Sequence, residues 1–255
     1  SIEPTHLDID LRVDIEARRA QGTVTHTLKV RREGADRLEL NAVDLDIDEV
    51  YDIGGAELSW RHDGEVLTVQ WAEGLEREAE HELAITYSVT EPRSGLMFSP
   101  PGDGPRWAAT DHETERARHW LPCIDKPQVR CTLEFRLRAH EDLTILANGQ
   151  LVEQTSHEDG THTAHWKLDW PCPSYITCFA IGEFVRAEDG EHEGKPIAYF
   201  ASRAHDPDDL VRSFGRTGEM LDWLTGLLDQ PLPYPKYYQF ALPGIGGAME
   251  NISLV

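Results

Sequence analysis

The chain has 255 residues and a formal net charge of −22, from 46 Asp and Glu side chains against 24 Lys and Arg. A field of that sign repels nucleic acid and anionic lipid, so we expect neither nucleic acid nor a membrane as a partner, and cationic ligands such as a free peptide amine are favoured. Hydrophobic residues make up 40% of the chain, which is enough for a buried core, so a folded rather than a disordered protein is expected.

The first part of the chain is predicted to consist of short β-strands. Between residues 7 and 16, apolar and charged side chains alternate with a period of two, as in a strand with one buried face. The apolar positions are Leu7, Ile9, Leu11, Val13 and Ile15. Further short runs follow at 23–30, 38–40, 43–47, 66–71, 83–89, 131–139, 143–147, 161–168 and 175–184. This pattern predicts a mainly β fold, an antiparallel β-sandwich, over residues 1–186.

The pattern changes near residue 186. Residues 186–195 are polar and contain glycine, which is typical of a linker, and 197–201 is a short strand. Asp206 is a favourable N-cap and Pro207 suits the first helical turn, so we predict one helix over 206–229 that ends before Pro231. Because another apolar run opens at the very end of the chain, we interpret residues 187–255 as the beginning of a second, incomplete domain.

The cysteines and the start of the chain bear on the compartment. The four cysteines form no C-x-x-C pair, which is the pattern of zinc ribbons and redox sites; they are Cys123, Cys131, Cys172 and Cys178. Residues 1–10 lack the basic and apolar regions of a secretory signal. Because disulfides are rare in reducing compartments, we expect free, mostly buried thiols and a cytoplasmic location.

A five-residue string near the end carries the strongest functional signal. Gly247-Ala248-Met249-Glu250-Asn251 resembles the substrate-binding motif of the M1 family of zinc aminopeptidases, which includes aminopeptidase N and leukotriene A4 hydrolase. The approach to the string is also similar to the family's, with Pro233-Tyr234-Pro235, then Lys236-Tyr237, then Phe240-Ala241-Leu242-Pro243. The resemblance extends over nearly all 255 residues.

The resemblance implies a domain organisation. Residues 1–186 would be the family's saddle-like β-sandwich, and residues 187–255 would begin a thermolysin-like α/β catalytic domain. Two positions depart from the family pattern. Tyr238 stands where many members have Asp, and Gly246 stands where some have a larger residue lining the pocket for the first residue of the substrate. Either departure would change the preferred side chain.

The motif also implies a way of recognising substrate. An exopeptidase must bind the free α-ammonium of a peptide, and a carboxylate does so through a charge-assisted hydrogen bond. The resemblance gives this role to Glu250. It implies that Gly246, Gly247 and Ala248 offer backbone groups to the peptide, since glycine lets a backbone approach closely. Met249 and Asn251 complete the expected substrate-binding set, and peptides with a free N-terminus are the expected partners.

A second carboxylate is expected from the first domain. In the family it precedes a turn that here is represented by Pro122-Cys123-Ile124-Asp125-Lys126-Pro127, and counting back along the family pattern leads to Glu113. Glu115 and Asp111, two residues away on either side, are rivals for the same role. Two acids around one ammonium would form a clamp for the substrate amine.

The zinc-binding pattern of the family is not found in this sequence. The family holds zinc with the two histidines of an H-E-x-x-H string and a later Glu, and the Glu of the string is the general base. No such string occurs in these 255 residues. We therefore expect zinc in the full-length parent, bound by the rest of the catalytic domain, and we expect this chain alone to bind no catalytic zinc and to hydrolyse nothing.

Three functions are compatible with these observations. The leading hypothesis is the N-terminal portion of a zinc-dependent aminopeptidase that removes N-terminal residues from peptides. The second is a non-catalytic M1-like interaction scaffold, although a scaffold has no need for Glu250. The third is a bifunctional epoxide hydrolase and aminopeptidase, whose relatives tend to carry Gln at the position of Glu113.

Overall fold

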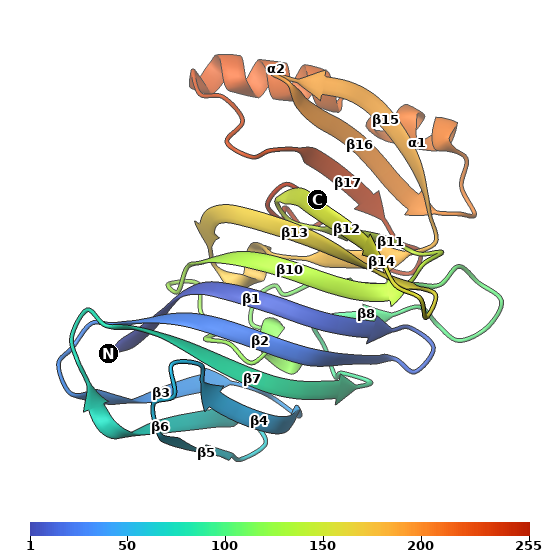
Figure 1. Cartoon of the computed structure of the whole chain (residues 1–255). Coiled ribbons are helices and arrows are strands. Elements are labelled where there is room, and N and C mark those ends of the chain that lie inside the picture. Colours follow the sequence, from blue (N-terminus) through green and yellow to red (C-terminus); the bar gives the residue numbers. More distant parts are fainter.

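The computed structural model describes residues 1–255, and most of the chain before residue 203 is β-structure (Figure 1). The first strands are β1 (Ile2–Asp14), β2 (Arg19–Val30), β3 (Ala35–Asn41), β4 (Asp46–Asp52), β5 (Leu58–His62), β6 (Val66–Leu75), β7 (Glu80–Thr90), β8 (Leu96–Phe98) and β9 (Trp107–Thr110). They are followed by β10 (Cys131–His140), β11 (Thr144–Ala147), β12 (Gln150–Ser156), β13 (Thr161–Cys172) and β14 (Phe179–Gly182). Short 3-10 helices lie at Ala117–His119 and Ser174–Ile176.

The strand with the clearest alternation, β1, lies at the centre of a seven-stranded sheet of order β12-β13-β10-β1-β2-β7-β4. Leu7, Ile9, Leu11 and Val13 are buried, as the alternation predicts. Pairing in this sheet is antiparallel except between β1 and β10, which run parallel with Leu7 opposite Leu133. Parallel pairing requires a long crossover, and the chain from β2 to β9 supplies it.

Two smaller sheets pack with the large one to form the predicted sandwich. The first has the order β11-β14-β9-β8 and the second the order β3-β6-β5. A core of 54 buried residues joins the three sheets. At its centre Phe179 of β14 meets Phe135 of β10 and Trp120 edge-on, with ring centroids 6.1 and 5.3 Å apart. Such aromatic contacts fix how the layers sit on one another.

The remainder of the chain forms a second unit, orange to red in Figure 1. It consists of β15 (Phe184–His192), β16 (Lys195–Ser202), α1 (Pro207–Phe214), α2 (Thr217–Leu228) and β17 (Tyr237–Ala241). The strands form a sheet of order β15-β16-β17. The predicted linker at 186–195 is therefore wrong, because most of it belongs to β15. The expected domain boundary at 186/187 falls inside this strand, after its third residue.

The predicted helix begins where expected but is interrupted. Asp206 caps α1 by accepting from the backbone N–H of Asp208 at 2.9 Å, within a capping box. The helix ends at Gly215, and α2 starts afresh after Arg216. A Cβ at Gly215 would lie 2.4 Å from the carbonyl oxygen of Val211, so glycine is the residue that fits this break. Neither helix is long and apolar enough to cross a membrane.

The β15-β16-β17 sheet buries both of its faces. On the helix side, a small core of six residues forms around Tyr199, Leu210 and Leu221. On the other side, Ala198 and Phe200 join the large core of the sandwich. The second unit is therefore packed directly against the β-sandwich. All four cysteines are buried and free, as predicted.

Candidate functional site

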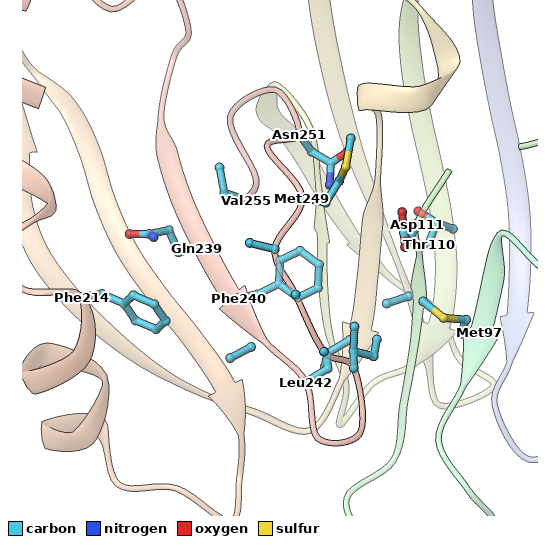
Figure 2. A pocket seen from close by; sticks show the side chains of 16 residues that line it. Met97, Thr110, Asp111, Phe214, Gln239, Phe240, Leu242, Met249, Asn251 and Val255 are labelled. Atoms are coloured by element: carbon cyan, nitrogen blue, oxygen red, sulfur yellow. The ribbon is translucent and has the colours of Figure 1, made fainter. Parts of the chain in front are cut away.

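A cavity of about 260 Å³ lies where the second unit meets the sandwich (Figure 2). One wall comes from the sandwich, with Met97 of β8 and the end of β9. The opposite wall comes from β17 and the loop that follows it, where Phe240 points towards the space between them in Figure 2. The lining residues are Met97, Ala109, Thr110, Asp111, Phe214, Gln239, Phe240, Ala241, Leu242, Ile245, Gly246, Gly247, Ala248, Met249, Asn251 and Val255. The wall is mainly apolar.

The cavity brings together most of the predicted site residues. Of the seven, Gly246, Gly247, Ala248, Met249 and Asn251 line it. Gly247 has φ 93°, a conformation that favours glycine, and the amide oxygen of Asn251 is buried without a hydrogen-bond partner.

The two predicted carboxylates are placed differently. Glu250 and Glu113 are both exposed and do not line the cavity. Each is nevertheless close to the wall in sequence, because Glu250 lies between Met249 and Asn251, and Glu113 follows Asp111 by two residues. Asp111, weighed above as a rival of Glu113, is the one acidic side chain among the lining residues.

The loop that carries Asp111 and Glu113 is folded around Arg116. Its guanidinium lies 2.9 Å from the carboxylate of Asp111 and donates from Nε to the backbone carbonyl of Glu113. The backbone N–H of Glu113 in turn donates to Asp111 Oδ1 at 3.3 Å. Asp111 is therefore paired within its own loop, whereas the Glu113 carboxylate has no ion-pair partner in the structure.

His112 anchors this loop to the sandwich. Its Nε2 accepts a hydrogen bond from the indole of Trp120 at 2.8 Å, so its Nδ1 carries the proton and donates to the carbonyl of Ser174 at 3.0 Å. Burial lowers the pKa of His112, which keeps the ring neutral and preserves this tautomer. The side chain is thus structural, and it holds its neighbours Asp111 and Glu113 at the edge of the sandwich.

Asp125 anchors the end of the same segment. Its fully buried carboxylate accepts from the backbone N–H and the Nε of Arg118, at 3.2 and 3.1 Å, and from the hydroxyl of Ser174 at 2.6 Å. Its backbone N–H donates to Asn41 Oδ1 at 3.1 Å. The turn used to locate Glu113 therefore has a physical role, because it ties the acid-bearing loop to two other parts of the sandwich.

The residues present do not fit a zinc ion. No group of three or more His, Cys, Asp or Glu side chains in the structure has an arrangement that would hold a metal. The histidine nearest to the cavity wall in sequence is used otherwise, since both ring nitrogens of His112 are hydrogen-bonded within the sandwich. We therefore derive no metal-dependent step from this chain.

Comparison with known proteins places the chain in a family. A profile of the peptidase M1 N-terminal domain matches residues 3–176, which contain most of the sandwich, up to the strand before β14, and the loop with Asp111 and Glu113. The chain belongs to this family.

The relatives are aminopeptidases. Aminopeptidase N of Lactobacillus delbrueckii subsp. lactis is 28% identical over 271 positions, and glutamyl aminopeptidase of Rattus norvegicus is 24% identical over 274. Each match covers 100% of this chain, but only 30% and 28% of those proteins. The chain thus spans less than a third of the length of the curated relatives it matches.

Solved structures show the same fold. An M1 zinc metallopeptidase from Deinococcus radiodurans has a TM-score of 0.84 at 20% identity, covering 99% of this chain and 59% of that one. Yeast LTA4 hydrolase has a TM-score of 0.83 at 19% identity, covering 99% and 40%. One variant of the Deinococcus enzyme holds the substrate Tyr-Ser-Ala.

Sequence reasoning missed two kinds of site residue. The apolar wall from β8 and β17, including Met97 and Phe240, had no signal beyond the strand pattern itself. Lys236 was seen only as part of a family string, yet its ammonium is buried between the two units. A lysine among prolines and aromatic residues carries no local sign of burial, so only the tertiary structure reveals its place.

Proposed function

We propose that this chain is the substrate-binding front part of an M1 aminopeptidase that removes N-terminal residues from peptides. The proposal rests chiefly on the cavity, because it is built jointly from the motif Gly247–Asn251 and from the end of β9. The relatives' names and the tripeptide held by the Deinococcus enzyme support the same activity.

In this proposal the cavity receives the side chain of the first residue of the peptide. Its wall is mainly apolar, with Met97, Phe240 and Leu242, so it suits an apolar side chain or the aliphatic stem of a longer one. The exposed carboxylates of Glu250 and Glu113 bind the α-ammonium, each from a loop that borders the cavity. Gly246, Gly247, Ala248, Met249 and Asn251 bind the peptide around it.

The catalytic zinc would belong to another part of the same protein. We propose that residues 1–186 are the β-sandwich domain and 187–255 the start of the catalytic domain, which the rest of that domain covers. The outward face of α2 supports this assignment, because Trp223 is 66% exposed and Met220, Leu227 and Leu228 are exposed beside it. We also propose a cytoplasmic location, where the four buried thiols would stay reduced.

An activity assay of the full-length gene product tests this function. With zinc present it should hydrolyse aminoacyl anilides with a free amine and leave N-acetylated versions intact. Glu250→Gln should raise KM for the free-amine substrate about 10- to 100-fold, because a charge-assisted hydrogen bond is lost. Glu188→Gln, which changes an exposed acid on β15, should not. Absence of hydrolysis, or equal cleavage of the acetylated substrate, would rule the proposal out.

A further inference from the structure

The ammonium of Lys236 is buried at the junction between the two units of the chain. The residue is 3% exposed, and Nζ donates to the carbonyls of Ala147 and Gly149 at 2.8 and 2.6 Å and to the hydroxyl of Ser253 at 3.2 Å. An ammonium has three N–H donors, so these acceptors use all of them. The rings of Trp166 and Tyr238 lie 4.7 and 5.2 Å from Nζ.

This lysine has no carboxylate partner, although the chain has an excess of acids. A buried charge without a counter-ion costs free energy unless dipoles replace its water shell. Here backbone carbonyls, a hydroxyl and two aromatic ring faces replace the water shell of the ammonium. Burial still lowers the pKa of Lys236 to about 7, so the arrangement is not one that maximises stability. Its structural consequence is that three acceptors from two separate segments, the Ala147–Gly149 turn and Ser253, must converge on one atom.

The turn Ala147–Gly149 of the sandwich, together with Cys178, also forms hydrogen bonds to residues 252–254, which follow the motif. The amide of Asn148 donates from Nδ2 to the carbonyl of Ile252, and the backbone N–H of Gly149 donates to the hydroxyl of Ser253 at 2.8 Å. The thiol of Cys178 donates to the carbonyl of Leu254 at 3.2 Å. Residues 252–254 are thus bound to the sandwich directly after the motif ends.

On its other side, this segment is joined to the strand that precedes the motif. The backbone N–H of Tyr238 donates to the carbonyl of Ser253 at 3.1 Å, and the N–H of Val255 donates to the carbonyl of Tyr238 at 2.8 Å. Lys236 stands one residue before β17 and therefore contacts three parts at once: the sandwich, β17 and the exit of the motif loop.

We propose that Lys236 is a positioning residue, whose ammonium joins the Ala147–Gly149 turn to Ser253 and so fixes the motif loop relative to the loop that carries Glu113. The inference rests on the proposed function, since it concerns the two carboxylate loops of the amine site. These loops come from different units, so their separation depends on how the units are joined. Lys236 is one part of that joint, beside the apolar packing of Ala198 and Phe200, and its ammonium helps to hold both loops where they can bind the peptide ammonium.

Hydrogen–deuterium exchange on the 255-residue chain tests the anchor without any activity. Lys236→Met keeps the length of the side chain and removes the ammonium. Exchange at the backbone amides of Ile252 and Val255 should become about tenfold faster or more, while the β1 and β2 amides stay protected. Lys29→Met, which removes a surface ammonium from β2, is the matched control and should change neither group. Unchanged exchange at 252–255 in Lys236→Met would overturn the proposal.

Kinetics of the full-length gene product test the consequence for the amine site. Lys236→Met should raise KM about tenfold and change kcat less than about threefold, because ground-state binding of the amine is what the joint supports. Ser253→Ala, which removes one acceptor and leaves the backbone intact, should give a smaller change in the same direction. Active enzyme with unaltered KM in both variants would overturn the positioning role. If no variant or wild type is active but exchange responds to Lys236→Met, the anchor stands and the aminopeptidase function fails.

Discussion

The carboxylate of Asp111 lies 2.9 Å from the guanidinium of Arg116, on the loop that borders the cavity. The pair neutralises the only acidic side chain on the cavity wall. In the proposed function, an apolar cavity with a neutralised acid favours an uncharged first residue of the substrate, whereas the same cavity with a free carboxylate would attract a cationic one.

Release of Asp111 should therefore shift substrate preference. In Arg116→Gln, the ratio of kcat/KM for lysyl over leucyl substrates should rise about fivefold, since a partly exposed ion pair is worth about 1 kcal/mol. The comparison uses the two aminoacyl anilides on the full-length gene product. Adding Asp111→Asn to the variant should return the ratio to its original value. A rise that survives in the double variant would mean that Asp111 is not its cause.

Gly149 should be intolerant of any side chain. It has φ 82°, and a Cβ there would lie 1.9 Å from the carbonyl oxygen of Lys167, a backbone atom that cannot move away. Gly149→Ala should lower the free energy of unfolding by about 2 kcal/mol or more, measured by urea denaturation. Gly226→Ala on α2 is the counterpart, because a Cβ there meets nothing within 4 Å. It should gain about 0.5–1 kcal/mol from helix propensity, and a loss similar to that of Gly149→Ala would contradict the argument.

Asp125 should contribute strongly to stability. Asp125→Ala removes the carboxylate that accepts from Arg118 Nε and from the Ser174 hydroxyl, so we expect a loss of about 3 kcal/mol in urea denaturation. Asp103→Ala, at an exposed loop position, should change stability by less than about 0.5 kcal/mol. Equal midpoints for the two variants would show that the Asp125 network carries no net stability.

The stability of the chain should depend on pH through Lys236. Its pKa is lowered by burial from 10.5 in the unfolded chain to about 7 in the folded one, with Cys178 acting weakly in the opposite direction. Between these values the unfolded state binds more protons, so stability rises with pH from about 7 to 10.5, and this contribution is lost as pH falls back to about 7. From pH 7 to pH 9 this group should add on the order of 2 kcal/mol. Urea denaturation at both values checks this, because the gain should be absent in Lys236→Met; an equal gain in that variant would assign it to other groups.

Some elements of the fold were predictable because their signals are local. The alternation of Leu7, Ile9 and Leu11 needs only one buried face, and the Asp206 cap needs only its own turn. β15 was missed because it is an edge strand of 9 residues in which only Ala187 and His192 are buried, so it has the composition of a linker. The break at Gly215 was missed because the apolar positions of α1 and α2 continue in phase across it.

The site residues also divide into those that the sequence identifies and those that only the tertiary structure shows. The motif residues and the Glu113 loop were identified through a family resemblance, and the roles of Glu250 and Glu113 remain proposals. Which side chains line the cavity depends on how β8, β9 and β17 meet, and residues as far apart as Met97 and Phe240 share no pattern in the sequence. Asp111 could be named as a rival but not preferred, because its pairing with Arg116 is visible only in three dimensions.

The backbone N–H of Phe240 donates to the carbonyl of Val255 at 2.8 Å, so the motif loop leaves and rejoins the protein beside one strand. A loop whose two ends are hydrogen-bonded to each other can be exchanged as one segment. Residues such as Ile245 could be exchanged, inserted or deleted without disturbing the sheet, because the strain of a new length ends at the closure. If the proposed function holds, grafting this loop from one relative into another, with the base retained, should transfer the preference for the first residue of a peptide.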